Sequence, residues 1–306
     1  MGKVVNLGVF VADTAYRAER APKMGETILG KSFALGPGGK GSNQSVASAM
    51  AGAETYFISR LGQDDFAQMA LATWKKAGVI PAVLQDPSSY TGAAYIFIED
   101  ATGNNAIIIS PGAAAQISNA DVDRNADLIA GADVFMTQLE QPIAVAFYAL
   151  ELARAAGVTT ILNPAPAAQL PDGMLALCDY VTPNESEAEA LTGVVVTGPE
   201  SALVAAKALR AKGAKVAIIT LGAQGVLVHD GMQTVHVPIV SAGPVVETTG
   251  AGDAFNGGFA AALAEGQGLL DAVRFGNATA GISVTRAGTA PSMPARAEID
   301  ALLART

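Results

Sequence analysis

The length, composition and charge of the chain limit what it can be. Its 306 residues, 50% hydrophobic and 15% charged, are enough for one large α/β domain with an insertion, or for two domains. The net charge of −9 argues against nucleic acid and against an anionic membrane as partners. A single cysteine, Cys178, excludes an internal disulfide, and no apolar run has membrane-spanning length, so we expect a soluble, cytoplasmic protein.

Strand-like and helix-like segments alternate along most of the chain. We expect strands at 3–11, 55–62, 133–140, 159–166 and 216–222, and helices at 42–53, 66–78, 144–157, 200–213, 254–266, 269–284 and 297–305. This alternation predicts an α/β fold, with a doubly wound, mostly parallel sheet and helices on both of its faces. Ligands of such sheets bind at the carboxyl ends of the strands.

Two segments interrupt the alternation. Residues 13–35 and 91–111 are strand-like with little helix between them, and 91–110 is typical of a hairpin around the turn 100–104. We expect these insertions to form a small β-sheet that acts as a lid and excludes water from a reactive site. The core would then consist of residues 1–12, 36–90 and 112–306.

Asp253 follows a Gly-Ala-Gly turn (250–252) and precedes an apolar, helix-like run. One interpretation is structural, because aspartate often caps the N-terminus of a helix. The other is catalytic, with Asp253 as a base beside main-chain N–H groups that hold an anion. The stretch alone favours the cap.

The glycine-rich stretch 36–43 fits neither of two common nucleotide motifs. It matches G-x-G-x-x-G but lacks the preceding buried strand, and Lys40 is followed by Gly41 rather than by Ser or Thr, as a Walker A loop requires. It does allow close approach of the backbone, and the amide of Asn43 suits the hydroxyls of a sugar. A plain turn into a helix remains an alternative. Glu140, at another predicted strand end, faces the same crevice.

Two further stretches have both a structural and a functional interpretation. Asn184 and Glu187 share a face at a helix start, where they either cap the helix or hold a hydrated Mg²⁺. The turn 220–225 closes an apolar strand and begins either a plain hairpin or a nucleotide contact.

Taken together and in this order, these stretches resemble the ribokinase-like (PfkB) carbohydrate kinases over essentially the whole chain. The stretches PKMGETILG, GPGGKGSNQSVASA and VTRAGTAPSMP are most similar to the ribose-phosphorylating members. The resemblance implies transfer of the γ-phosphate of ATP to a sugar hydroxyl, with D-ribose converted to ribose 5-phosphate as the first expectation. It also implies a homodimer formed through the lid.

The resemblance assigns a role to each matching residue. It makes Asp253 the base and Gly250, Ala251, Gly252 and Asp253 the anion hole. The residues that it assigns to the sugar are Asp13, Gly39, Lys40, Gly41, Ser42, Asn43 and Glu140. Those that it assigns to the nucleotide are Thr220, Leu221, Gly222, Ala223, Gln224, Gly225 and Asn277. Asn184 and Glu187 would organise Mg²⁺ and the phosphates through water.

Two positions depart from the pattern of the family. A monovalent cation site would use Glu247 where the family usually has Asp, with Thr249, Ser283, Arg286, Gly288 and Ser292, so activation by K⁺ is a hypothesis. Val11 replaces an Asn that contacts the sugar, and valine cannot form that hydrogen bond. One hydroxyl contact is therefore lost, or the substrate differs.

Other functions remain open at this point. The substrate can be another pentose, a ketohexose or a nucleoside, and a nucleoside would need an aromatic slot such as Tyr16, Tyr95 and Phe97 offer. A sugar-binding regulator without catalysis is a third possibility. The intact Asp253, its glycine turn and the Asn184–Glu187 pair argue against this regulator.

Overall fold

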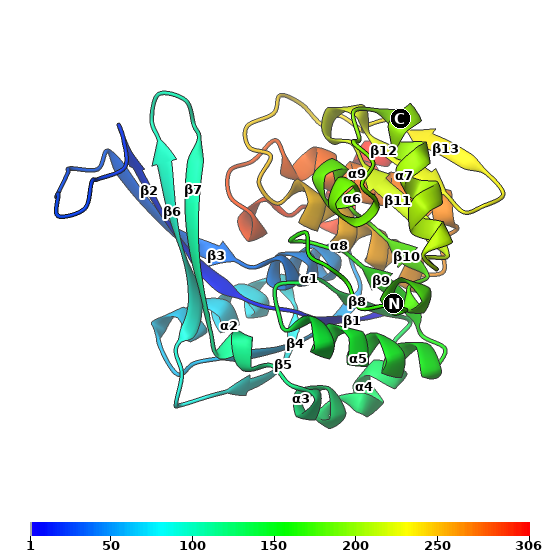
Figure 1. The fold of residues 1–306 in the computed structure, drawn as a ribbon, viewed down its shortest axis with the longest axis horizontal. Helices are drawn as coiled ribbons and strands as arrows, with labels where there is room; N and C mark the ends of the chain where they lie inside the picture. Colours follow the sequence, from blue (N-terminus) through cyan, green and yellow to red (C-terminus); the bar gives the residue numbers. More distant parts are fainter. Residues whose placement is uncertain (1) are drawn as a thin grey trace.

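The computed structural model describes residues 2–306, which form a large sheet with a smaller one beside it (Figure 1). Within these residues the larger sheet has the strand order β13-β12-β11-β10-β9-β8-β1-β4-β5. Its strands are β1 (Lys3–Leu7), β4 (Glu54–Leu61), β5 (Ile80–Gln85), β8 (Val134–Thr137), β9 (Thr159–Leu162), β10 (Tyr180–Val181), β11 (Val216–Thr220), β12 (Val226–His229) and β13 (Thr234–Val237). The strands from β11 to β5 are parallel, whereas β12 and β13 pair antiparallel. The predicted mostly parallel sheet is confirmed.

Helices cover both faces of the larger sheet. They are α1 (Lys40–Met50), α2 (Asp65–Ala77), α3 (Asn119–Arg124), α4 (Ala126–Ala130), α5 (Ile143–Ala155), α6 (Glu185–Thr192), α7 (Pro199–Ala211), α8 (Ala251–Ala264), α9 (Leu269–Ser283) and α10 (Arg296–Leu303). Short 3-10 turns occupy Ala113–Gln116, Met174–Leu177, Gly222–Gln224 and Ala290–Ser292. None of the helices in residues 2–306 is long and apolar enough to cross a membrane.

The alternation of side chains along β1 explains why both faces are covered. Val5 and Leu7 are buried in one core with residues of α5, α6 and α7. Val4 is buried in another core with residues of α8, α9 and α10. Successive residues of a strand point to opposite faces, so an apolar strand needs helices on both sides.

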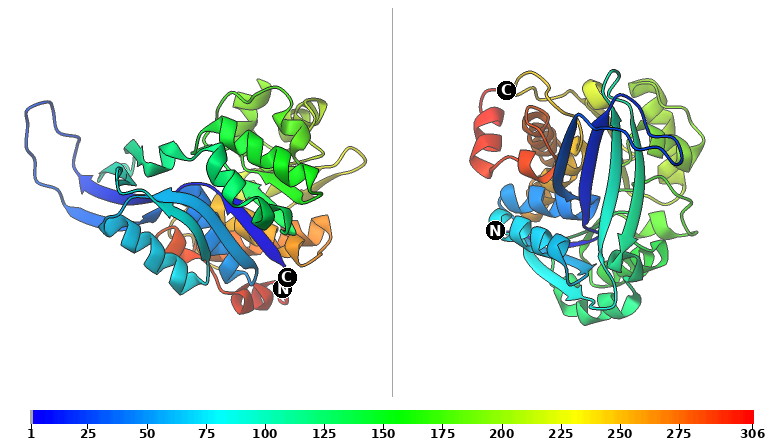
Figure 2. Two further views of the ribbon diagram at one scale, coloured as in Figure 1. Left: turned by 90° about the horizontal axis from the view of Figure 1, so that it is seen from below. Right: turned by 90° about the vertical axis from the view of Figure 1, so that its left-hand side faces the viewer.

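The smaller sheet has the order β3-β2-β6-β7 and projects from the core (Figures 1 and 2). Its strands are β2 (Val11–Ala18), β3 (Ser32–Gly38), β6 (Thr91–Glu99) and β7 (Asn105–Gly112). The predicted hairpin is present, because β6 and β7 pair antiparallel around the turn 100–104. The sheet begins at Val11 rather than at residue 13, and β3 continues to Gly38. A separate sheet is therefore present, and its function as a lid stays a prediction.

Close packing of α1 against α8 positions the candidate site. A Cβ atom on Gly257 would overlap Ala47 and the carbonyl of Gln44, so only glycine allows this approach. The start of α1 also packs against the end of β1, where Gly8 and Gly41 lie too close for a side chain on either. As a result, the first turns of α1 and α8 meet at the carboxyl ends of the parallel strands.

Candidate active site

Asp253 lies in the first turn of α8, and its side chain is only 7% exposed. The helix begins at Ala251, and the residue before it, Gly250, has a φ of 81°, which favours glycine. No side chain caps this helix. The expectation that Asp253 is the cap is therefore wrong. Asp253 is the third residue of the helix, and its carboxylate bonds to side chains of α1 instead.

Two amides of α1 hold the carboxylate of Asp253. Asn43 Nδ2 donates to Oδ2 at 3.0 Å, and Gln44 Nε2 donates to Oδ1 at 3.0 Å. Burial raises the pKa of Asp253, whereas Lys40 and these two amides oppose the rise by stabilising the charged form. Asp253 is thus a buried carboxylate with a fixed orientation.

The start of α8 presents main-chain N–H groups beside this carboxylate. The N–H of Ala251 donates to Thr248 and that of Ala254 to Gly250. Within residues 2–306, the N–H groups of Gly252 and Asp253 have no main-chain or side-chain acceptor. They lie at the positive end of the helix dipole, which suits an anion. Of the four N–H groups of the predicted anion hole, only that of Ala251 has an acceptor within residues 2–306, because that of Gly250 is also without one.

Charged side chains from several elements surround Asp253. Burial would by itself lower the pKa of Lys40, but Asp253, Glu140 and Glu187 outweigh it and raise that pKa. Burial raises the pKa of Glu140 to about 7, and burial together with Asp253 raises that of Asp13 to about 6. The structure therefore gathers three carboxylates around Lys40, with Asp13 close to Asp253 and Glu140, an arrangement typical of a functional site.

The side of the site assigned to the sugar has one unsatisfied buried atom. Asn43 Oδ1 is buried and has no hydrogen-bond partner in the part of the chain that the structure describes. A hydroxyl of a bound ligand would satisfy it, since buried acceptors are costly when left unpaired. Asp13 lies against Gly38, where a Cβ would overlap its carboxylate, and Glu140 Oε2 accepts the N–H of Lys40 at 2.7 Å.

Two residues of the predicted sugar stretch have packing contacts instead. Ser42 is fully buried, and its hydroxyl accepts a hydrogen bond from the indole Nε1 of Trp74 at 2.9 Å. Gly41 packs against Gly8. Gly39, with a φ of 87°, is the turn residue before α1. Ser42 and Gly41 therefore pack α1 against its neighbours, whereas Asn43 bonds to Asp253 and Lys40 acts on it through its charge.

A cavity of about 560 Å³ adjoins the start of α8. Of the predicted nucleotide residues, Thr220, Gly222, Ala223, Gly225 and Asn277 line it, whereas Leu221 is buried in the core and Gln224 lies outside the lining. Sequence reasoning missed a second group of lining residues: Ile239, Val240, Ser241, Gly243, Val245, Thr248, Phe255, Ala280, Gly281 and Val284. They combine into a mostly apolar wall, which suits a flat, apolar group such as a nucleobase.

Asn184 and Glu187 form a capping box at the start of α6. Asn184 Oδ1 accepts the N–H of Glu187 at 2.8 Å, and Glu187 Oε2 accepts the N–H of Asn184 at 2.9 Å. The structural interpretation of this pair is therefore correct. The capping box does not use Oε1 of Glu187. Burial raises the pKa of Glu187. No cluster of three or more His, Cys, Asp or Glu residues that could hold a metal occurs in residues 2–306.

Of the residues predicted to bind a monovalent cation, Glu247 and Thr249 precede α8, Ser283 ends α9, and Arg286, Gly288 and Ser292 follow it. Glu247 Oε2 accepts the N–H of Gly288 at 2.8 Å, which joins the segment before α8 to this loop. The hydroxyls of Ser283 and Ser292 donate to the carbonyls of Ala280 and Thr289. Glu247 therefore reaches the loop, and a cation here would have to compete with the N–H of Gly288 for Oε2 of its carboxylate.

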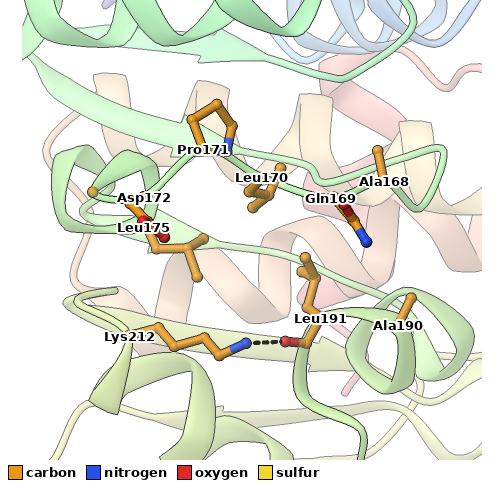
Figure 3. Close-up of a pocket in the computed structure, with 10 residues that line it drawn as sticks. Ala168, Gln169, Leu170, Pro171, Asp172, Leu175, Ala190, Leu191 and Lys212 are labelled. Carbon is orange, nitrogen blue, oxygen red and sulfur yellow. Dashed lines mark hydrogen bonds between the residues drawn. The ribbon is translucent and has the colours of Figure 1, made fainter.

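A second cavity, of about 450 Å³, lies away from these residues (Figure 3). It is lined by the loop 168–173 and by Leu175, Ala190, Leu191 and Lys212. Lys212 Nζ donates to the carbonyl of Leu191 across it. None of the predicted site residues lines this cavity.

The fold and the site define a class of enzyme. A buried carboxylate beside free helix N–H groups, next to a cavity for a second ligand, is an arrangement for group transfer. The sequence profile of the pfkB family of carbohydrate kinases matches residues 1–296, so the chain belongs to that family. This membership places it among the enzymes that transfer a phosphoryl group from ATP to a sugar.

Individual relatives agree with the family. The chain is 39% identical over 293 residues to a ribokinase of Haemophilus influenzae, with 95% of each chain covered. It is 34% identical over 290 residues to a deoxyribokinase of Salmonella typhi, with 94% of each covered. Among solved structures, Arabidopsis thaliana ribokinase complexed with ribose and ATP superimposes with a TM-score of 0.92 at 32% identity, covering 99% of both chains.

Proposed function

We propose that this chain phosphorylates D-ribose with ATP to give ribose 5-phosphate, and that Asp253 is the catalytic base. The observation that carries this proposal is the position of Asp253 between Asn43, with its unpartnered Oδ1, and the free N–H groups of α8. The ribokinase relatives and the solved ribokinase with bound ribose and ATP support the choice of substrate.

In the proposed reaction a hydroxyl oxygen of the sugar attacks the γ-phosphorus of ATP. Its new bond to phosphorus forms as the bond from phosphorus to the bridging oxygen breaks, and ADP leaves. The hydroxyl proton passes to the carboxylate of Asp253. A raised pKa brings the carboxylate closer to the working pH, which improves it as a proton acceptor.

The chain also supplies positive charge where negative charge accumulates. The N–H groups of Gly252 and Asp253 lie at the start of α8, where they can hold the oxygens of the transferring group. The positive charge of Lys40 offsets part of the negative charge of the surrounding carboxylates. Mg²⁺ bound with ATP would neutralise the phosphates, and Asn184 and Glu187 would hold it through water, which fits a cation that retains several water ligands.

The test of this proposal is the release of ADP from ATP and Mg²⁺ across a panel of pentoses, hexoses and nucleosides. We expect ribose to give the highest kcat/KM. Should no sugar be phosphorylated while one still binds, the regulator interpretation would replace the kinase.

A second candidate substrate is a pentose that lacks one hydroxyl, such as 2-deoxyribose. Val11 is 5% exposed and lies on β2 two residues before Asp13, so both side chains point to the same face of the strand. An apolar side chain there favours a carbon without a hydroxyl. The deoxyribokinase relative shows that this part of the family includes an enzyme named for such a substrate.

We also propose that the smaller sheet is the lid and the dimer contact. On one face, across its paired strands, it exposes large apolar side chains that a second sheet would cover, with exposed fractions of 57% for Phe33, 42% for Tyr16, 36% for Tyr95 and 66% for Ile108. Contiguous exposed apolar residues indicate an interaction surface. Light scattering should give the mass of a homodimer, and Ile108→Lys should shift it toward the monomer. A kinase that uses ATP also fits the expected cytoplasmic location.

A further inference from the structure

A chain of buried amides connects Asp253 to strand β1 and to the residues that directly follow β8 and β9. Its central member is Gln44 of α1, which is completely buried. Gln44 Nε2 donates to Asp253 Oδ1 and to Asn163 Oδ1, each at 3.0 Å. Its Oε1 accepts from Gln138 Nε2 at 2.6 Å. Both N–H bonds and the carbonyl of this amide therefore have partners.

The neighbours of Gln44 are themselves fixed. Gln138 Nε2 also donates to Asn6 Oδ1 at 3.0 Å, and Asn6 Nδ2 donates to the carbonyl of Gly41 at 2.9 Å. On the other branch, Asn163 Nδ2 donates to the carbonyl of Thr182 at 2.9 Å. Both branches thus end on main-chain carbonyls, which can only accept hydrogen bonds.

This anchoring fixes the direction of every amide in the chain. If Gln44 were turned over, its oxygen would face the oxygens of Asp253 and Asn163, and its nitrogen would face that of Gln138. Such contacts are costly in a buried site of low dielectric. The sheet therefore determines, through Gln138 and Asn163, that a donor faces Asp253.

We propose that Gln44 is a positioning residue for the base, and that the amides of Asn6, Gln138 and Asn163 hold it in that role. This inference rests on the proposed function of Asp253. Gln44 fixes Oδ1 and Asn43 fixes Oδ2, so the carboxylate cannot rotate, and each oxygen keeps capacity for one further bond. Catalytic groups need such support, because small displacements are costly in rate.

Removing the amide of Gln44 should have a specific effect. Gln44 donates to the charged form of Asp253, so its loss favours the protonated form and moves the acidic limb of the kcat–pH profile to higher pH. The other charged groups near Asp253 are Lys40 of α1, Asp13 of β2, Glu140 after β8 and Glu187 of α6. None of them forms a hydrogen bond with Gln44, so the variant leaves their contacts in place.

The test compares Gln44→Met with Gln141→Met in the full-length protein. Gln141 is another buried glutamine, and it bonds to Thr137 and to the carbonyl of Gln138 but not to Gln44 or Asp253. Both variants lose a buried amide at similar volume. We expect Gln44→Met to lower kcat about 10-fold or more, to shift the acidic limb upward and to change the KM for sugar less than about threefold. Gln141→Met should leave the acidic limb of the kcat–pH profile at the pH of the unchanged protein.

A double-mutant cycle separates positioning from a general structural effect. If Gln44 acts through Asp253, Gln44→Met should cause no further loss of kcat in the Asp253→Asn background. Two results would overturn the inference. One is a double variant whose loss of kcat is the product of the two single losses, and the other is an acidic limb of Gln44→Met at the same pH as that of Gln141→Met. If Gln44→Met does not fold, Gln138→Met is the second variant. It removes the donor to Gln44 Oε1 and to Asn6 Oδ1 but keeps Gln44 itself, so it should shift the acidic limb in the same direction by less. An unshifted limb in Gln138→Met would then overturn it.

The outcomes also distinguish this inference from the proposed function. High turnover in Asp253→Asn would refute the base itself, whatever Gln44→Met does. A silent Asp253→Asn with an unshifted Gln44→Met would refute only the positioning role.

Discussion

The main-chain N–H of Lys40 donates to Oε2 of Glu140 at 2.7 Å, although the two residues are 100 positions apart. This bond joins the first residue of α1 to the loop that follows β8. It holds a half-buried carboxylate at the start of a helix, where the dipole favours negative charge. Glu140 therefore lies in a fixed position next to Lys40 and close to the residues assigned to the sugar.

Glu140→Ala should raise the half-saturating sugar concentration by about 10-fold or more, which corresponds to losing a hydrogen bond to a charged group. The KM for ATP should change much less. Glu140→Gln is the matched control, because it keeps an acceptor for Lys40 but removes the charge. Initial rates over a range of sugar concentrations measure both effects. An unchanged half-saturation for sugar in Glu140→Ala would remove Glu140 from the sugar site.

Asp13→Asn should stabilise the ligand-free protein at high pH. The folded-state pKa of Asp13 is raised to about 6 from 3.8, so the folded protein binds more protons between these values and its stability falls as pH rises through this range. Replacing the carboxylate removes that loss. We expect the melting temperature at pH 8 to rise by about 2 °C or more, with little change at pH 4. Thermal unfolding at the two pH values measures it, and an equal change at both would contradict the explanation.

Val11→Asn should shift the substrate preference toward sugars with a full set of hydroxyls. A restored hydrogen bond of about 1 kcal/mol would raise kcat/KM for ribose over 2-deoxyribose about fivefold. Val11→Thr is a control of similar shape with a single hydroxyl, and we expect a smaller shift in the same direction. Rates with both sugars measure the ratio. If neither variant changes the ratio, Val11 does not contact the sugar.

Activation by K⁺ depends on Glu247 and its contact with Gly288. If the loop after α9 holds a cation, activity in K⁺ should exceed activity in an equal concentration of a large organic cation such as tetramethylammonium. Glu247→Ala should reduce that difference. Equal activity in both salts would indicate that the bond from Gly288 to Glu247 takes the place of the cation.

The sequence predicted best the features that depend on local patterns. The alternation of strands and helices predicted the sheet, and the hairpin at residues 91–111 was recognisable from its turn. The sequence alone placed Asp253 and Asn43 at predicted helix starts and Glu140 at a predicted strand end, but their convergence around Lys40 depends on the α1–α8 packing. That packing in turn requires Gly257, whose role has no local signal.

Other features of the site could not be predicted from local patterns. The cap interpretation of Asp253 failed because the helix starts two residues earlier, at Ala251, which makes Asp253 the third helical residue. The wall formed by residues 239–245 and Phe255 carries no motif, since apolar loop residues line a cavity only when the fold brings them there. Gln44 and Gln138 likewise resemble ordinary polar residues until their burial is known.

The most direct test of the account is the turnover of Asp253→Asn compared with the unchanged protein, measured as ADP release with ribose, ATP and Mg²⁺. The loss of a general base predicts a kcat lower by roughly 10²–10⁴-fold. Sugar affinity, measured by calorimetry, should remain nearly unchanged, because Asn can replace the shape of Asp. A variant with near-normal turnover would contradict the assignment of Asp253 as the base.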